Sequence, residues 1–240
     1  MQVIELRNYL LEAGRTGDFL RYFEEHFLFS QRDEGMHVLG QFAVVDQPDR
    51  FVWIRAFADM AARLRGLRGF YGGHFWQARR DVANAMMREH HDVHLLRPLG
   101  PVDAVTAGAS LEDRGSEPPG VLPPEAGVVV LDFLRTAPGG LARLVDVFEQ
   151  EMRPALIEGG HRVLAHFVAE LTPNDYPRLP VIQDPALLVV LSAYPDQTHY
   201  VRLRADGRGT SAIERNGSAE ATTLVLRPTA RSLIRYREET

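Results

Sequence analysis

The sequence contains no cysteine. This absence excludes disulfide bonds, thiolate catalysis and zinc or iron–sulfur centres held by cysteine. No apolar stretch approaches the roughly 20 residues that a membrane helix requires. The first ten residues, MQVIELRNYL, carry a charge by the fifth position and lack the long apolar run of a signal peptide. We therefore expect a cytoplasmic protein without a membrane span.

A large excess of one charge is also missing. The net charge is −5 and the pI is about 6.0, which gives no overall attraction to nucleic acid or to anionic lipid. We therefore expect no nucleic-acid partner. The 240 residues are 45% hydrophobic, which is ordinary for a globular chain of one large or two small domains.

Common catalytic signatures are missing too. The chain has no glycine-rich phosphate loop, no GxSxG elbow and no kinase-type motif. His90, His91 and His94 have a spacing seen in metal sites, but His94 should already lie in a strand, and no HExxH motif or carboxylate companion follows. We therefore predict neither a metal site nor a bound cofactor.

An internal repeat is the strongest positive feature of the chain. Blocks of similar sequence recur in the same order, and chance could hardly produce all of them. The matching pairs are 23–24 with 148–149, 35–42 with 160–167, 52–59 with 189–196, and 95–98 with 225–228. We predict a first repeat over residues 1–99, a Gly/Pro-rich linker over 100–127, and a second repeat over 128–240 with a longer loop at 171–186.

Each repeat has the pattern of a ferredoxin-like β-α-β-β-α-β module. Thr16 is a good candidate for the N-cap of the first helix, Gly35 is placed to end it, and Asp59 should cap the second helix, with Asp196 as its counterpart. The expected strands of the first repeat are 3–9, 36–45, 51–57 and 93–97, and its expected helical segments begin after Thr16 and cover 60–69 and 76–87.

A sheet of this kind carries helices on one face only. Strand alternation puts Tyr9, Trp53 and Phe57 on one face, which we assign to the side opposite the helices. That face must be covered, and two such sheets packed face to face would cover each other. The predicted fold is therefore α+β, with two tandem ferredoxin-like repeats forming a pseudo-dimeric α/β barrel.

Several short motifs, in this order and spacing, resemble the NIPSNAP family of the dimeric α/β-barrel superfamily. They are Glu5-Leu-Arg-x-Tyr9, the Gly35…Leu39-Gly40…Phe42 strand entry, and a segment from Phe70-Tyr71 through Trp76, Arg80 and Asn84 to Pro98. The resemblance implies the barrel fold. The superfamily includes cofactor-free monooxygenases, haem-binding enzymes and isomerases, so the fold alone does not select a function.

The face that carries Tyr9 also carries charge. Glu5 and Arg7 lie on it with Trp53 and Arg55, and Asp132 stands in the second repeat where the first has Arg7. These side chains could line a ligand cavity between the sheets, with apolar walls and a few polar groups. Alternatively, the charged ones neutralise one another as structural ion pairs, because buried charges must be paired.

A second candidate set lies on the segment that only the first repeat has. Trp76, Arg80 and Asn84 are spaced i, i+4 and i+8, which places them on one stripe of a helix. They could line the mouth of a pocket, with Arg80 binding an anion. The alternative is a core tryptophan and a clamp between helix and sheet.

Two functions remain open from the sequence. The first is a protein that binds a small, anionic or aromatic molecule between the sheets, as a cofactor-independent oxygenase or isomerase. Arg7 and Arg55 would then orient the ligand, Tyr9 would hydrogen-bond to it, and Trp53 would form a wall. The second is a non-catalytic structural or interaction module whose barrel is filled by side chains. A homo-oligomer is compatible with either function.

Overall fold

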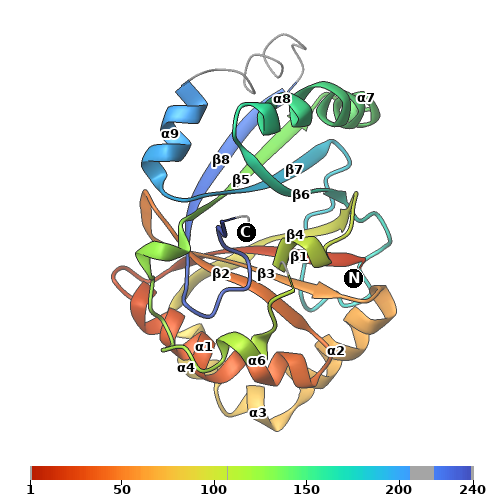
Figure 1. Ribbon diagram of the computed structural model, residues 1–240. Helices are drawn as coiled ribbons and strands as arrows, with labels where there is room; N and C mark the ends of the chain where they lie inside the picture. The colour runs from red at the N-terminus through yellow and green to blue at the C-terminus, as the bar shows by residue number, and fades with distance from the viewer. Residues whose placement is uncertain (1, 107, 206–218, 239–240) are drawn as a thin grey trace.

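One closed barrel of eight antiparallel strands forms the centre of the protein (Figure 1). The computed structural model describes residues 2–106, 108–205 and 219–238, and the elements below lie within them. The strands of the first repeat are β1 (Val3–Leu11), β2 (His37–Val44), β3 (Gln47–Phe57) and β4 (Met87–Pro98). Those of the second repeat are β5 (Val128–Thr136), β6 (Arg162–Ala169), β7 (Leu187–Tyr194) and β8 (Ala219–Pro228).

Helices cover the barrel at two opposite sides, one for each repeat (Figure 1). In the first repeat they are α1 (Thr16–Asp33), α2 (Met60–Gly72), α3 (His74–Gln77) and α4 (Arg80–Asn84). The connection between the repeats carries α5 (Asp103–Thr106), α6 (Leu111–Arg114) and the 3-10 turn η1 (Pro124–Ala126). The second repeat has α7 (Leu141–Val147), the π-helical turn η2 (Phe148–Met152), α8 (Arg153–Glu158) and α9 (Gln197–Ala205).

The predicted pseudo-dimeric barrel is confirmed, and its two sheets also pair along their edges. The strand order around the barrel is β1-β3-β2-β8-β5-β7-β6-β4. Strand β2 pairs with β8, and β4 pairs with β6, so the second strand of each repeat meets the fourth strand of the other at both seams. Closure in this way leaves no free sheet edge within the barrel.

Most of the predicted helix boundaries match the structure. Gly35 has a φ of 74° just after α1, and Asp59 accepts a hydrogen bond from the Ala62 amide at 2.7 Å at the start of α2. Asp196 accepts one from the His199 amide at 2.7 Å. The predicted Thr16 cap is wrong, because α1 begins at Thr16 itself and the Thr16 hydroxyl donates to the Pro48 carbonyl instead.

The prediction of which sheet face points into the barrel is also wrong. The barrel interior is filled by apolar side chains of both repeats, among them Leu6, Ile54 and Leu131. Tyr9, Trp53 and Phe57 lie on the outer face instead, packed against α1 and α2. Both faces of these strands are buried, so alternation showed which residues share a face but not which face the helices cover.

The connection between the repeats and the segment after β8 both bind to the first repeat. Glu24 of α1 accepts hydrogen bonds from the Gly120 amide at 2.6 Å and from the Thr229 hydroxyl. The amides of Leu233 and Ile234 both donate to the Leu39 carbonyl at 3.0 Å. Residues 100–127 and 229–238 are therefore packed against the first repeat.

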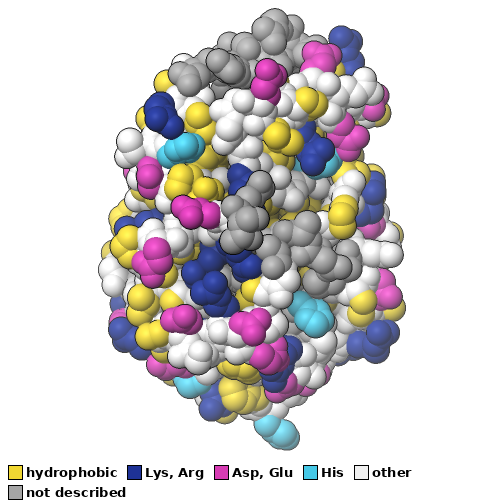
Figure 2. Space-filling view, viewed as in Figure 1, with side chains coloured by type: hydrophobic (Ala, Val, Ile, Leu, Met, Phe, Trp, Pro, Cys, Tyr) yellow, Lys and Arg dark blue, Asp and Glu magenta, His cyan; other side chains and the backbone are white. Residues whose placement is uncertain are grey.

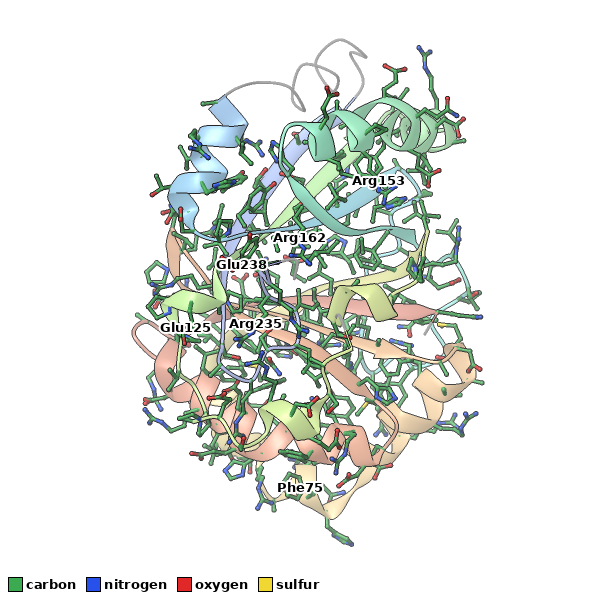
Figure 3. The ribbon with its side chains drawn as sticks, in the orientation of Figure 1. Phe75, Glu125, Arg153, Arg162, Arg235 and Glu238 are labelled. Carbon is green, nitrogen blue, oxygen red and sulfur yellow. The ribbon has the colours of Figure 1, made fainter. Side chains whose placement is uncertain are left out.

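The segment after β8 places basic side chains on one face of the molecule. Figure 2 shows basic side chains gathered near the centre of this face, and Figure 3 places Arg235 there, close to the seam between the two repeats. Burial lowers the pKa of Arg235, and the nearby Arg114 and Arg237 lower it further. Arg235 also donates to the Thr229 and Ala230 carbonyls at 2.9 and 2.7 Å, which fixes the turn of this segment.

The long loop of the second repeat crosses to the first repeat. The Ile182 amide donates to the Val93 carbonyl at 2.7 Å, and the Leu95 amide donates to the Ile182 carbonyl at 3.0 Å. Residues 171–186 are thereby held along β4. No helix in the described part of the chain has both the length and the apolar character needed to cross a membrane.

We predict that Gly40→Ala destabilises the barrel. A Cβ at Gly40 would lie 2.3 Å from the ring of the fully buried Phe42. Overpacking of this kind costs about 1–3 kcal/mol. The measurement is the free energy of unfolding in urea. Gly17→Ala is the matched control, because a Cβ there meets nothing within 4 Å in the first turn of α1 and should change stability by at most about 1 kcal/mol. Equal effects of the two substitutions would contradict this packing.

Candidate functional site

A single buried carboxylate organises the outer face of the first sheet. Glu5 on β1 accepts hydrogen bonds from Arg7 at 2.7 Å, from Arg55 of β3 at 2.6 and 2.8 Å, and from Arg63 of α2 at 2.8 Å. None of these four side chains is more than 2% exposed. The expected structural ion pairs of Glu5 with Arg7 and Arg55 are therefore present, and Arg63 joins them.

The cluster carries more positive than negative charge. Three guanidinium groups meet one buried carboxylate, and among the described residues the only further anion in contact is Asp175, 3.2 Å from Arg63 and 32% exposed. Burial alone would raise the pKa of Glu5, but Arg55, Arg7 and Arg63 outweigh it and hold that pKa far below its usual value. Glu5 is therefore ionised at neutral pH, and a net positive potential remains on this side of the sheet.

Each arginine of the cluster also contacts a second group. The Arg7 Nε donates to the Tyr9 hydroxyl at 2.8 Å, and the guanidinium lies 5.3 Å from the ring centre of Trp53. The Arg55 Nη1 donates to the Gln31 side chain at 2.7 Å. Arg55 is thus bound within the core, whereas Arg7 faces an open space.

That space is a cavity of about 270 Å³, which we call the first-repeat cleft. It lies on the outer face of the first sheet, between β1, β4, the short helices α3 and α4, and the long loop of the second repeat. It is lined by Arg7, Tyr9, Tyr71, Trp76, Arg80, Asn84, Met87, His90, Tyr176, Arg178 and Leu179.

The charged lining of the first-repeat cleft is cationic. Arg7 comes from β1, Arg80 from α4, and Arg178 from the loop of the second repeat. Among the described residues that line the cleft there is no carboxylate. Such a site attracts an anion and repels a cation.

The walls of the cleft are aromatic. The Tyr71 ring lies 5.1 Å from that of Trp76 and stacks on Tyr176 at 6.3 Å. A smaller space of about 30 Å³ shares Tyr9, Tyr71, Trp76 and Met87 with the cleft and reaches inward to Trp53. The buried Trp53 Nε1 has no hydrogen-bond partner among the described residues.

The structure brings together some of the predicted site residues and separates others. Arg7, Tyr9, Trp76, Arg80 and Asn84 all line the first-repeat cleft. The last three do so although the predicted single helix is broken into α3 and α4. The Trp76 ring also packs on those of Phe27 and Phe70, each at 5.4 Å between ring centres. Trp76 therefore both lines the cleft and belongs to the core.

Glu5, Arg55 and Trp53 do not reach the cleft. Glu5 and Arg55 are enclosed in the ion cluster, and Trp53 lines only the inner space. The expected roles of Arg55 in orienting a ligand and of Trp53 as the wall of the main pocket therefore do not fit the structure. The expected place of that pocket, between the sheets, is occupied by the apolar core.

Asp132 belongs to a different space, which we call the second-repeat cleft. This cavity of about 50 Å³ lies on the outer face of the second sheet, and Leu134, Phe148, Met152 and Val190 are among its apolar walls. Asp132 lies 3.2 Å from Arg204 and accepts a hydrogen bond from the Thr223 hydroxyl. It therefore does not neutralise the Glu5 cluster, contrary to the sequence-based alternative.

The polar side chains of the second-repeat cleft are paired with one another. His161 and the Tyr194 hydroxyl form a hydrogen bond of 2.7 Å. Burial, with a smaller effect of Asp132, raises the pKa of Tyr194. Burial also lowers the pKa of His161, so both groups are neutral at pH 7. The two clefts thus differ in charge as well as in size.

Several residues that line the first-repeat cleft were not among the predicted site residues. Tyr71 and Met87 lie within or beside the segment that resembles NIPSNAP proteins, and His90 lies in the histidine motif. Tyr176 and Arg178 come from the other repeat, and no local pattern indicates that their loop crosses over. The histidine motif does not gather into a metal site, since no group of three or more potential ligands is found in the described chain.

Comparison with known proteins supports the fold. No family model matches the chain, and no curated protein matches it. A proposed monooxygenase from Lactobacillus acidophilus is 12% identical, with a TM-score of 0.60 over 95% of this chain and 93% of that chain. A haem-binding protein from Thermus thermophilus is 11% identical, with a TM-score of 0.54 over 97% and 93% of the two chains.

The fold therefore defines a dimeric α/β-barrel protein with both halves in one chain. Structures of NIPSNAP proteins are similar over a shorter stretch. A NIPSNAP-like domain protein from Burkholderia xenovorans is 20% identical and covers 42% of this chain and 89% of its own, with a TM-score of 0.39. The similar stretch is close to one repeat in length.

We predict that Glu5→Gln strongly destabilises the protein at neutral pH. Three buried guanidinium groups would lose their shared anion, and breaking a buried ion pair in this way costs about 3–5 kcal/mol. The measurement is the free energy of unfolding. Glu25→Gln on the exposed side of α1 is the matched control and should lie within about 0.5 kcal/mol of wild type.

The effect of Glu5→Gln should depend on pH. Because the folded-state pKa of Glu5 is lowered, its contribution is complete above the ordinary glutamate pKa of about 4.3 and is lost as pH falls toward the lowered value. The stability difference between wild type and Glu5→Gln should therefore shrink as pH falls below about 4. A constant difference down to low pH would contradict the assigned charge state.

Proposed function

We propose that this protein binds a small, anionic, aromatic molecule in the first-repeat cleft. The observation that carries the proposal is the convergence of Arg7, Arg80 and Arg178, from three separate segments, on one cavity of about 270 Å³. A ligand carboxylate or similar anion would supply the negative charge that the lining lacks.

The three arginines are suited to different parts of binding. Arg80 and Arg178 are exposed at the rim, and the contact of Arg80 with the exposed Asp81 is long, at 3.5 Å. An exposed pair of this kind contributes little, so Arg80 can exchange it for a ligand anion. Arg7 is held inside by Glu5 and Tyr9, and it presents a fixed charge.

The aromatic lining favours a flat ligand. Tyr71, Trp76 and Tyr176 present ring faces and edges within a few ångströms of one another. The Tyr9 hydroxyl accepts a hydrogen bond from Arg7, which leaves its own proton for a ligand acceptor. The cavity volume of about 270 Å³ lies slightly below the range for small-molecule sites, which begins at roughly 300 Å³, so the cleft suits a small ligand.

The position of the cleft changes the functional hypothesis in one respect. The space between the sheets is filled by side chains, which fits the non-catalytic alternative for that region. The ligand site is instead proposed between the first sheet and its helices. Conversion of the ligand, as a cofactor-independent oxygenase or isomerase, would require a proton acceptor within this cleft.

We predict that phenylpyruvate, an anionic arene small enough for the cleft, binds and that its neutral primary amide binds at least tenfold more weakly. Arg80→Ala and Arg178→Ala should each weaken binding of phenylpyruvate by about 10–100-fold, the usual effect of losing a hydrogen bond to a charged group. The measurement is isothermal titration calorimetry. Both residues are exposed, so the melting temperature should change little.

Arg88→Ala is the matched control for this experiment. Arg88 is an exposed arginine of β4 next to the lining residue Met87, but it does not line the cleft. It should leave the affinity within about twofold of wild type. Equal binding of acid and amide, or an equal loss in the Arg88 variant, would rule out a site made by the arginines of the cleft.

A further inference from the structure

We infer that His90 is a catalytic base in the first-repeat cleft and that the ligand class is an enolisable aromatic 2-oxo acid, which the protein tautomerises. This inference rests on the proposed function, because it requires the anionic ligand to occupy the cleft. It adds a reaction and a residue that binding alone does not require.

The backbone around His90 is irregular in a way that turns its side chain toward the cleft. Strands β1 and β4 pair with Asn8 opposite Asp92 and Leu10 opposite Glu89, so Tyr9 stands opposite two residues, His90 and His91. An extra residue of this kind is a β-bulge, and bulges next to active sites re-aim side chains. The result is that His90 lines the cleft beside Tyr9, whose ring it meets edge to face at 6.3 Å.

The imidazole of His90 has an unused nitrogen. Its Nδ1 is buried without a hydrogen-bond partner in the described structure. His90 lines the cleft, and we assign the reaction to its other ring nitrogen, Nε2. His91 is exposed, and its ring lies tilted against that of His90 with 4.2 Å between the ring centres.

Charges around His90 favour its neutral form. Burial lowers the pKa of His90, and His91 and Arg7 lower it further. The other titratable groups of the cleft are Arg80, Arg178 and the phenols of Tyr9, Tyr71 and Tyr176, and no carboxylate opposes them among the lining residues described. The imidazole is therefore free to accept a proton near pH 7.

The step balances without a cofactor or a second reactant. With the carboxylate held by Arg80 and Arg178, the proton on the carbon next to the ketone passes to His90 Nε2. The electron pair of that C–H bond becomes the C=C bond of an enolate, and the negative oxygen is stabilised by the Arg7 guanidinium. Return of the proton to oxygen gives the enol, and its return to carbon regenerates the ketone.

The test is the exchange of the C3 protons of phenylpyruvate with solvent in D₂O, followed by proton NMR. The wild-type protein should accelerate this exchange, and His90→Gln should lower the protein-dependent rate by at least about 100-fold, the lower range for loss of a general base. The dissociation constant for phenylpyruvate should change less than about threefold. His90→Asn serves as a second variant if His90→Gln lowers the melting temperature.

His91→Gln is the matched control. It should keep the plateau rate of exchange but move the midpoint of the pH–rate profile upward, because one of the groups that lowers the pKa of His90 is removed. Binding of phenylpyruvate without accelerated exchange would overturn the role of His90 and leave the proposed binding function standing. Absence of binding would overturn both, and full exchange in the His90 variants would overturn the role of His90 alone.

Discussion

The buried carboxylate of Glu5 fixes the geometry of the first repeat. Its two oxygens join β1, β3 and α2 through Arg7, Arg55 and Arg63. Arg63 continues to Asn174 and Asp175 at 3.0 and 3.2 Å, so the same cluster also holds the loop that comes from the second repeat. One carboxylate therefore positions both the sheet side and the loop side of the first-repeat cleft.

Burying the charges of this cluster carries a desolvation cost, so its contribution to the structure must be sought in what it positions. Buried ion pairs are often no more stabilising than apolar residues of the same size, because desolvation offsets the attraction. What the cluster adds here is position, since it presents Arg7 to the cavity in one orientation. The printed sequence has 27 basic residues and none of them is lysine. The planar fork of arginine lets each member bond Glu5 and a second acceptor at once.

The two repeats share a fold but have different clefts. The position of Arg7 in the first repeat is occupied by Asp132 in the second, which is paired with Arg204 in a cavity of only about 50 Å³. The first-repeat cleft is also closed by Tyr176 and Arg178 of the second repeat. The binding site that we propose therefore needs both halves of the chain.

The fold could be predicted from the sequence because its signals are the order of the repeated blocks and the periodic spacing of apolar residues. The repeated blocks, the glycine after α1 and the aspartate caps are local signals, and they led to the correct barrel. The inward face could not be predicted, because Ile4 and Leu6 on one side and Glu5 and Arg7 on the other are all buried. Alternation carries information about a face only when one side meets water.

The site was predictable only in part, because some of its residues meet through tertiary contacts that no local pattern indicates. Helical spacing grouped Trp76, Arg80 and Asn84 on one side of the predicted helix. The helix is broken in the structure, but all three residues still line the cleft. No local pattern in the sequence indicates that Arg63 is fully buried against Glu5. Tyr176 and Arg178 reach the cleft through a crossing that only the tertiary structure determines.

The most direct measurement is a crystal structure of the protein with 4-iodobenzoate, with the iodine located by its anomalous scattering. We predict an iodine peak among the aromatic walls of the first-repeat cleft, with the carboxylate density within hydrogen-bond distance of Arg80 or Arg178. Iodine peaks in the second-repeat cleft with none in the first would contradict the account.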